Sequence, residues 1–137
     1  ELEVRIFRGD LSVADIPAAW NELYKKYLDL DVPNDSMGCL QDVHWAYGSF
    51  GYFPTYTLGN IYCAMLVEKM EADMPDMWPS IAQGHFAPTL DWLRANIHRV
   101  GRRLESVPLI EKVTGKAITC DPLIKHLTTK YRQIYGF

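Results

Sequence analysis

The stretch Gly38–Tyr62 gathers side chains of the types that carry chemistry in enzymes. Asp42 stands two residues before His44, and Tyr52 and Tyr56 follow in the same stretch. A carboxylate near an imidazole can fix the tautomer of the ring or raise its pKa, so that the ring donates to a developing oxyanion. A phenol can do similar work, because its pKa of about 10 keeps it protonated at neutral pH.

The same residues are equally typical of a buried hydrogen-bond network with a purely structural role, because buried polar groups need partners whether or not they catalyse a reaction. The stretch also holds four tyrosines, one tryptophan, two phenylalanines and four glycines. Aromatic rings stabilise a protein by being buried, and glycines let the backbone approach another group closely. This combination suggests rings that line a cleft, and it leaves both roles open.

No nucleotide-binding loop or serine-hydrolase motif accompanies the cluster. Gly48, Gly51 and Gly59 do not follow a predicted strand, so tight backbone packing is a better interpretation of them than phosphate binding. The cysteines are odd in number and form no CxxC pair, which predicts reduced cytosolic thiols and neither disulfides nor a cysteine zinc site. They are Cys39, Cys63 and Cys120.

No two histidines have the i, i+4 spacing of an HExxH helix, which places two imidazoles on one helical face around a metal. We therefore expect no metal site built from motif residues in this chain. His126 is expected to be solvated, and His98 suits the negative end of a helix dipole. The histidines are His44, His85, His98 and His126.

The composition is that of one globular domain with a substantial core, because 48% of the 137 residues are apolar and 12% are aromatic. A net charge of −3 gives no basic footprint for nucleic acid and does not favour an anionic membrane. The longest apolar run, Ile61–Val67, is far shorter than the ~20 residues of a spanning helix. Neither nucleic acid nor a membrane is an expected partner.

Helical periodicity flanks the stretch on both sides and no run alternates with period two for long, so the predicted fold class is all-α. Residues 1–7 are expected to be the tail of a helix whose beginning is missing. An amphipathic helix is predicted from about residue 15 to 30, after a Ser-x-x-Asp start. Another helix is predicted beyond Pro54 and ends near Asp73. The further predicted elements are a short turn or helical piece bracketed by Pro75 and Pro79, a helix carrying Leu90 to Val100 that Gly101 stops, a helix at 107–114 closed by Gly115, and a last helix with Asp121 as N-cap and Pro122 at its first position.

The residues of this stretch resemble the thermostable carboxypeptidase 1 (carboxypeptidase Taq) family of zinc metallocarboxypeptidases. Gly38-Cys-Leu-Gln-Asp-Val-His-Trp45 is similar to the family signature G-x-x-Q-D-x-H-W, and Gly48–Asn60 is similar to the segment that follows it. The resemblance covers essentially the whole chain. It extends to Gly9-Asp-Leu-Ser-Val, to the segment Trp92–His98, to Thr114-Gly115 and to the last helix with Lys130-Tyr131.

The resemblance implies a mostly helical HExxH metallopeptidase-like fold of which residues 1–137 form a single C-terminal region. Family members are longer, cytosolic and homodimeric, and they release C-terminal residues from peptides. Their metal, zinc or cobalt, is held by an HExxH helix and a downstream glutamate, and neither that motif nor the upstream H-P-F motif occurs in this sequence. The chain is therefore expected to be inactive by itself and to need the missing N-terminal part of the same enzyme.

Within the whole enzyme, the resemblance implies that a metal-bound water attacks the scissile carbonyl of the peptide substrate. His44 and one of two tyrosines, Tyr52 or Tyr56, would stabilise the oxyanion or grip the end of the substrate. Substrate-binding roles fall to Gln41, to Asp42, which would orient His44, and to Trp45. The alternative from a different class is a non-enzymatic helical interaction or dimerisation domain whose aromatic cluster grips a partner.

Overall fold

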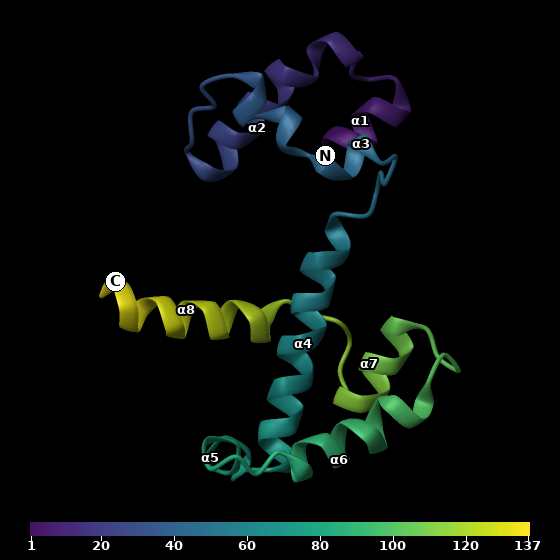
Figure 1. Ribbon diagram of the computed structural model, residues 1–137, viewed down its shortest axis with the longest axis vertical. Coiled ribbons are helices and arrows are strands. Elements are labelled where there is room, and N and C mark those ends of the chain that lie inside the picture. Colours follow the sequence, from purple (N-terminus) through teal and green to yellow (C-terminus); the bar gives the residue numbers. More distant parts are fainter. The chain divides into compact units, whose positions relative to one another are not determined.

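The computed structural model describes residues 1–137, which form helices joined by turns and contain no strand, as the all-α prediction requires. The chain divides into two compact units, Glu1–Thr55 and Tyr56–Phe137. The prediction that residues 1–137 form one region stays a prediction. The α-helices are α1 Leu2–Arg8, α2 Ile16–Leu28, α3 Val43–Ala46, α4 Pro54–Asp73, α5 Met77–Ala82, α6 Ala87–Asn96, α7 Ser106–Thr114 and α8 Asp121–Tyr135 (Figure 1).

In the first unit, α1 and α2 contact each other and are joined by a short 3-10 turn, Val13–Asp15. Gly9 ends α1 in the left-handed conformation, with a φ of 80° that favours glycine. The predicted Ser-x-x-Asp start is present, because the Ser12 hydroxyl donates to Asp15 Oδ2 over 2.6 Å. A 3-10 turn, Val13–Asp15, leads directly into α2, which begins at Ile16. The predicted helix start at about residue 15 is therefore within one residue of the observed start.

The sequence predicted that three glycines of the central stretch, Gly48, Gly51 and Gly59, allow tight backbone packing. A Cβ at Gly48, Gly51 or Gly59 would meet nothing within 4 Å, so that prediction is wrong for all three. Gly48 and Gly51 have φ angles of 70° and 75°, which other residues rarely adopt, and they turn the chain between α3 and α4. Close packing instead occurs at Gly38, where a Cβ would lie 2.6 Å from Val32 Cγ1.

The second unit is arranged around α4, the longest helix, with α6 and α7 on one side of it and α8 on the other (Figure 1). Its predicted extent, from Pro54 to near Asp73, is confirmed. Trp92 of α6 donates its indole N–H to Asp73 Oδ2 over 2.9 Å, which ties α6 to the end of α4. The Lys69 ammonium, together with this indole, lowers the pKa of the Asp73 carboxyl below its ordinary value of 3.8.

Three predicted helix ends in the second unit differ in detail from the structure. Pro79 lies inside α5 and does not bracket it. The α-helical part of α6 ends at Asn96, and a 3-10 turn, His98–Val100, carries the chain on to Gly101. Asp121 is the first residue of α8, which Cys120 precedes as N-cap, so the helix begins one residue before the predicted position. By contrast, Gly115 closes α7 with a φ of 70°, as predicted.

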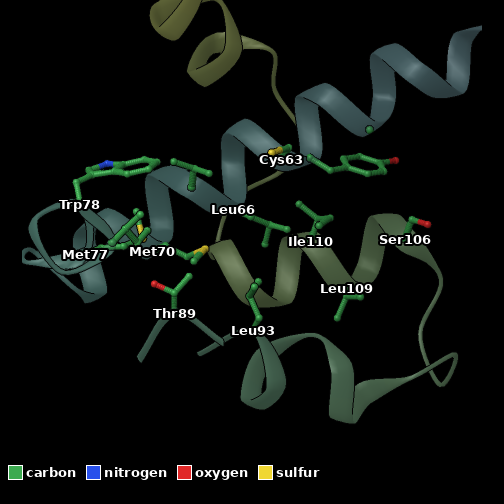
Figure 2. A pocket seen from close by; sticks show the side chains of 14 residues that line it. Cys63, Leu66, Met70, Met77, Trp78, Thr89, Leu93, Ser106, Leu109 and Ile110 are labelled. Carbon is green, nitrogen blue, oxygen red and sulfur yellow. The ribbon is translucent and has the colours of Figure 1, made fainter. Parts of the chain in front are cut away.

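An apolar pocket of about 550 Å³ lies within the second unit between α4 and the helices α5 to α7 (Figure 2). Leu66 and Met70 of α4 line it together with Leu93 of α6 and Ile110 of α7. A groove of about 780 Å³ lies between α4 and α8. None of the residues predicted to act on a substrate lines either space, so the candidate site has to be sought in the first unit.

Candidate functional site

Asp42 places His44 by capping the short helix α3. Asp42 Oδ1 accepts from the backbone N–H of His44 over 2.9 Å and from that of Trp45 over 3.4 Å. The backbone of Asp42 is extended, with φ −76° and ψ 90°, which is the conformation of a helix N-cap. A helix of four residues has little intrinsic stability, so this cap and the local packing hold His44 in place.

The same carboxylate oxygen also faces the His44 ring. His44 Nδ1 lies 3.4 Å from Asp42 Oδ1, within ion-pair distance and longer than an ordinary N–H···O hydrogen bond. The two side chains are 19% and 11% exposed, so the contact lies in surroundings that are partly shielded from water. One carboxylate therefore both caps the backbone that carries His44 and lies beside Nδ1 of its ring.

Aromatic rings flank His44 on the side of the following segment. The centroid of the Tyr52 ring lies 5.7 Å from that of His44, and the edge-to-face contact with Phe53 has a centroid distance of 5.2 Å. Tyr52 and Phe53 are themselves half exposed. The structure thus brings three of the predicted site residues, Asp42, His44 and Tyr52, into one cluster at the surface of the first unit.

Trp45 points into a different environment from its neighbour His44. Its ring contacts Trp20 of α2 edge to face at 5.9 Å and stacks on Phe50 at the same centroid distance. Phe50 in turn meets the ring of Phe7 of α1 at 5.1 Å. These aromatic contacts connect α1, α2 and the segment after α3, which is a structural role that the substrate-binding prediction for Trp45 did not include.

Glu3 of α1 is the polar partner of this aromatic cluster. Its Oε1 accepts from the Trp45 indole N–H over 2.8 Å, and its Oε2 accepts from the backbone N–H of Gly51, also over 2.8 Å. The side chain is half-buried between α1 and the glycine-containing turn. Both carboxylate oxygens are thus used to hold segments more than forty residues away along the chain.

The other two predicted site residues lie elsewhere. Gln41 is exposed, and its side-chain amide donates to the carbonyl of Ser36, so it closes the loop before α3. Tyr56 lies in the first turn of α4, just beyond the division between the two units, and is half exposed. The roles predicted for Gln41, Trp45 and Tyr56 toward a substrate stay predictions.

No group of three or more histidine, cysteine, aspartate or glutamate side chains is arranged to hold a metal ion. His44 and Asp42 supply only one imidazole and one carboxylate, which are fewer protein ligands than zinc sites use. The residues of this chain therefore do not fit a complete metal site. The three cysteines are free thiols in this structure, and no helix has the length and apolar character needed to cross a bilayer.

Sequence reasoning missed Glu3 and Phe53. Glu3 was assigned only to the tail of a helix, because nothing in a single sequence joins residues 3 and 45. One signal was available: a tryptophan that is mostly buried needs an acceptor for its indole N–H. That signal predicts that an acceptor exists without saying which residue it is.

Comparison with known proteins identifies relatives along nearly the whole chain. The family model described as carboxypeptidase Taq (M32) metallopeptidase matches residues 1–131. Thermostable carboxypeptidase 1 of Thermus thermophilus is 48% identical over 136 residues, which are 99% of this chain and 27% of that protein. Carboxypeptidase 1 of Bacillus subtilis is 41% identical over 98% of this chain and 27% of its own length.

Solved structures give the same result for the fold. The crystal structure of the M32 carboxypeptidase from Deinococcus radiodurans R1 superposes with a TM-score of 0.92 at 40% identity, covering 99% of this chain and 28% of that one. The chain therefore spans about a quarter of the length of the relatives that it matches.

Proposed function

This chain belongs to the family of carboxypeptidase Taq (M32) metallopeptidases, and from that premise we propose that it is the C-terminal part of a metal-dependent carboxypeptidase. The whole enzyme would release C-terminal amino acids from peptides, and this part would supply one wall of the substrate cleft. The observation that carries the proposal is the cluster of Asp42, His44 and Tyr52, which lies inside the segment matched by the family model.

His44 would be the residue of this wall that contacts the reacting end of the peptide. A ring N–H of His44 can donate a hydrogen bond to an oxyanion or to the terminal carboxylate of a substrate. The partial exposure of the ring leaves it within reach of a ligand. This geometry supports a role in binding negative charge and gives no reason to assign His44 as a nucleophile.

A tyrosine would act beside His44. The ring separation of 5.7 Å supports Tyr52 as the closer candidate within the first unit. Tyr56 remains the second candidate, because it follows by only four residues and begins α4. Gln41 and Trp45 complete the proposed wall, Gln41 by hydrogen bonding to the peptide and Trp45 chiefly by fixing the backbone on which His44 stands.

We propose zinc or cobalt as the metal, held by residues outside this chain, because the described side chains do not form a metal site. Bound in the whole enzyme, the metal would polarise the scissile carbonyl and activate water. The further proposed properties are a homodimer, assembly with the remaining N-terminal part of the same enzyme, and a cytoplasmic location.

A second function, a non-enzymatic interaction or dimerisation domain, draws support from one observation. Many aromatic side chains of the central stretch are exposed, and Tyr47 is exposed to 81%. Large exposed apolar patches often mark protein interfaces. A chain that spans a quarter of its relatives would expose such residues in any case, so an oligomer that persists on dilution is the observation that would favour this second function.

The test is an activity assay of the full-length protein that contains this chain. We expect release of C-terminal amino acids from a set of blocked peptides, loss of that release after chelation, and its return on addition of zinc or cobalt. The 137-residue chain alone should release nothing and should bind no zinc tightly and stoichiometrically. A full-length protein that leaves every peptide intact with metal present, or a sub-micromolar zinc site in the chain alone, would contradict the proposal.

A further inference from the structure

We propose that Glu3 is a positioning residue for the site, holding the segments that carry His44 and Tyr52 at a fixed spacing; this inference rests on the proposed function. Its two carboxylate oxygens accept from Trp45 Nε1 and from the backbone N–H of Gly51. Trp45 is the residue after His44, and Gly51 is the residue before Tyr52. One side chain therefore fixes the backbone immediately next to both site residues.

The segment that Glu3 holds also has local backbone hydrogen bonds, among them Ser49 N–H to the His44 carbonyl over 2.9 Å and Tyr52 N–H to the Ser49 carbonyl over 3.4 Å. It passes through Gly48 and Gly51, both at positive φ, and a side chain at either position would have no neighbour within 4 Å. Such a turn is open to solvent and gains little from packing. Phe50 is its main apolar anchor, through contacts with Phe7 and Trp45. The bond from Gly51 to Glu3 differs from these local bonds, because it ties the turn before Tyr52 to α1.

A carboxylate suits this position better than an amide does. Both partners of Glu3 are N–H donors, and an ionised carboxylate accepts at both oxygens. A glutamine has one acceptor oxygen and one NH₂ group, so one of the two donors would face another donor and lose its bond. Hydrogen bonds to an ionised acceptor are also stronger than those between neutral groups.

The consequence for the reaction is geometric. A catalytic group must lie close to its productive position, and a displacement of about 1 Å can cost ~100-fold in rate. Release of Gly51 would let Tyr52 move relative to His44 without unfolding α1, α2 or α3. Loss of Glu3 should therefore lower kcat while the fold and the metal content are kept, which is the pattern of a positioning residue rather than of a general stabiliser.

The experiment substitutes Glu3→Gln in the full-length protein and measures kcat, KM, metal content and circular dichroism. We expect kcat to fall at least about tenfold, with metal content and helicity unchanged at a temperature well below the melting transition. Glu111→Gln is the matched control, because Glu111 is an exposed glutamate of α7, and it should keep the parent kcat. Amide ¹⁵N spectra should also show the Trp45 indole or Gly51 resonance shifting in Glu3→Gln and staying in place in Glu111→Gln.

A second variant separates positioning from loss of stability. Trp45→Phe removes the indole donor, so the single amide oxygen of Glu3→Gln can then accept from Gly51, and Glu3→Gln should lower kcat by a smaller factor in the Trp45→Phe background than in the parent. A Glu3→Gln protein with kcat within twofold of the parent, or a double variant whose losses simply multiply, overturns the inference. If the parent protein releases no C-terminal residue at all, the proposed function fails and takes this inference with it; an active parent with a fully active Glu3→Gln variant overturns the inference alone.

Discussion

At the scale of single residues, Asp42 performs two tasks with one oxygen. Its Oδ1 caps α3 through the backbone N–H groups of His44 and Trp45, and the same atom lies 3.4 Å from His44 Nδ1. Capping needs only an oxygen that accepts hydrogen bonds, and it does not need a negative charge on the side chain. The second task depends on the negative charge. Substitutions can therefore separate the structural contribution of this residue from its electrostatic one.

We expect Asp42→Asn in the full-length protein to keep the cap and lose the charge. Asparagine and aspartate are about equally good N-caps, so the melting temperature should change little, whereas kcat should fall because the ring loses its anionic partner. Asp42→Ala should lose both contributions, and removal of a cap costs about 0.5–2 kcal/mol of stability. Thermal melts and steady-state kinetics of the pair give both quantities.

Equal losses in the two variants would argue against separate structural and electrostatic contributions of Asp42. If Asp42→Asn and Asp42→Ala lose the same stability and the same kcat, the carboxylate acts only as a cap. If Asp42→Asn keeps the parent kcat, the charge of Asp42 has no part in the function of His44.

At the scale of elements, the long periodic helices could be predicted from the sequence and the short segments that build the site could not. α2 and α4 carry apolar residues at helical spacing over several turns, and both were predicted close to their observed bounds. α3 has four residues, too few for any periodicity, and Asp42 was considered only as a partner of the imidazole. The capping role of Asp42 can be recognised only from the structure, which shows its extended backbone and its hydrogen bonds to the N–H groups of α3.

The glycines of the central stretch make the same point. Their number predicted close packing, yet only the backbone conformation separates a turn glycine such as Gly51 from a packed one such as Gly38. At Gly38 a Cβ would lie 2.6 Å from Val32 Cγ1 and 3.2 Å from the Asn34 carbonyl oxygen. The absence of a side chain at Gly38 therefore allows Val32 and Asn34 to approach its backbone closely in the loop before α3.

We expect Gly38→Ala and Gly59→Ala to have opposite effects on stability. Overpacking of this kind costs typically about 1–3 kcal/mol, so Gly38→Ala should lower the free energy of unfolding by that order. Gly59 is inside α4 with nothing within 4 Å of a Cβ, and alanine is favoured over glycine in a helix by roughly 0.5–1 kcal/mol. Chemical denaturation of the two variants measures both. A Gly38→Ala protein as stable as the parent would show that the loop has room to relax.

At the scale of the whole molecule, the chain is helical throughout, and its candidate site residues lie apart from its pockets. It spans about a quarter of its relatives, and its second unit has an apolar pocket lined by none of the candidate site residues. The sequence motif around His44 was enough to recognise the family, which the family model then confirmed over residues 1–131. It was not enough to find Glu3, because a contact between α1 and the turn before α4 depends on the fold and leaves no local pattern.

Two kinds of aromatic residue that look alike in the sequence have different surroundings in the structure. Trp45 and Phe50 have neighbours in α1 and α2 and belong to the internal packing of the first unit. Tyr52 and Phe53 flank His44 and are half exposed, as residues that face a ligand must be. This difference supports the proposal that His44 and Tyr52 form the substrate-facing part of the stretch.

The most direct test of the central claim is the steady-state kinetics of His44→Ala in the full-length protein, with metal content measured on the same preparation. Removal of one donor that stabilises an oxyanion typically lowers kcat by about 100- to 1,000-fold. We predict a loss of that order with the metal content unchanged, because the role proposed for His44 is toward the substrate and the proposed metal ligands lie outside this chain. An unchanged kcat would remove His44 from the site, and a parallel loss of metal would show that it is a ligand instead.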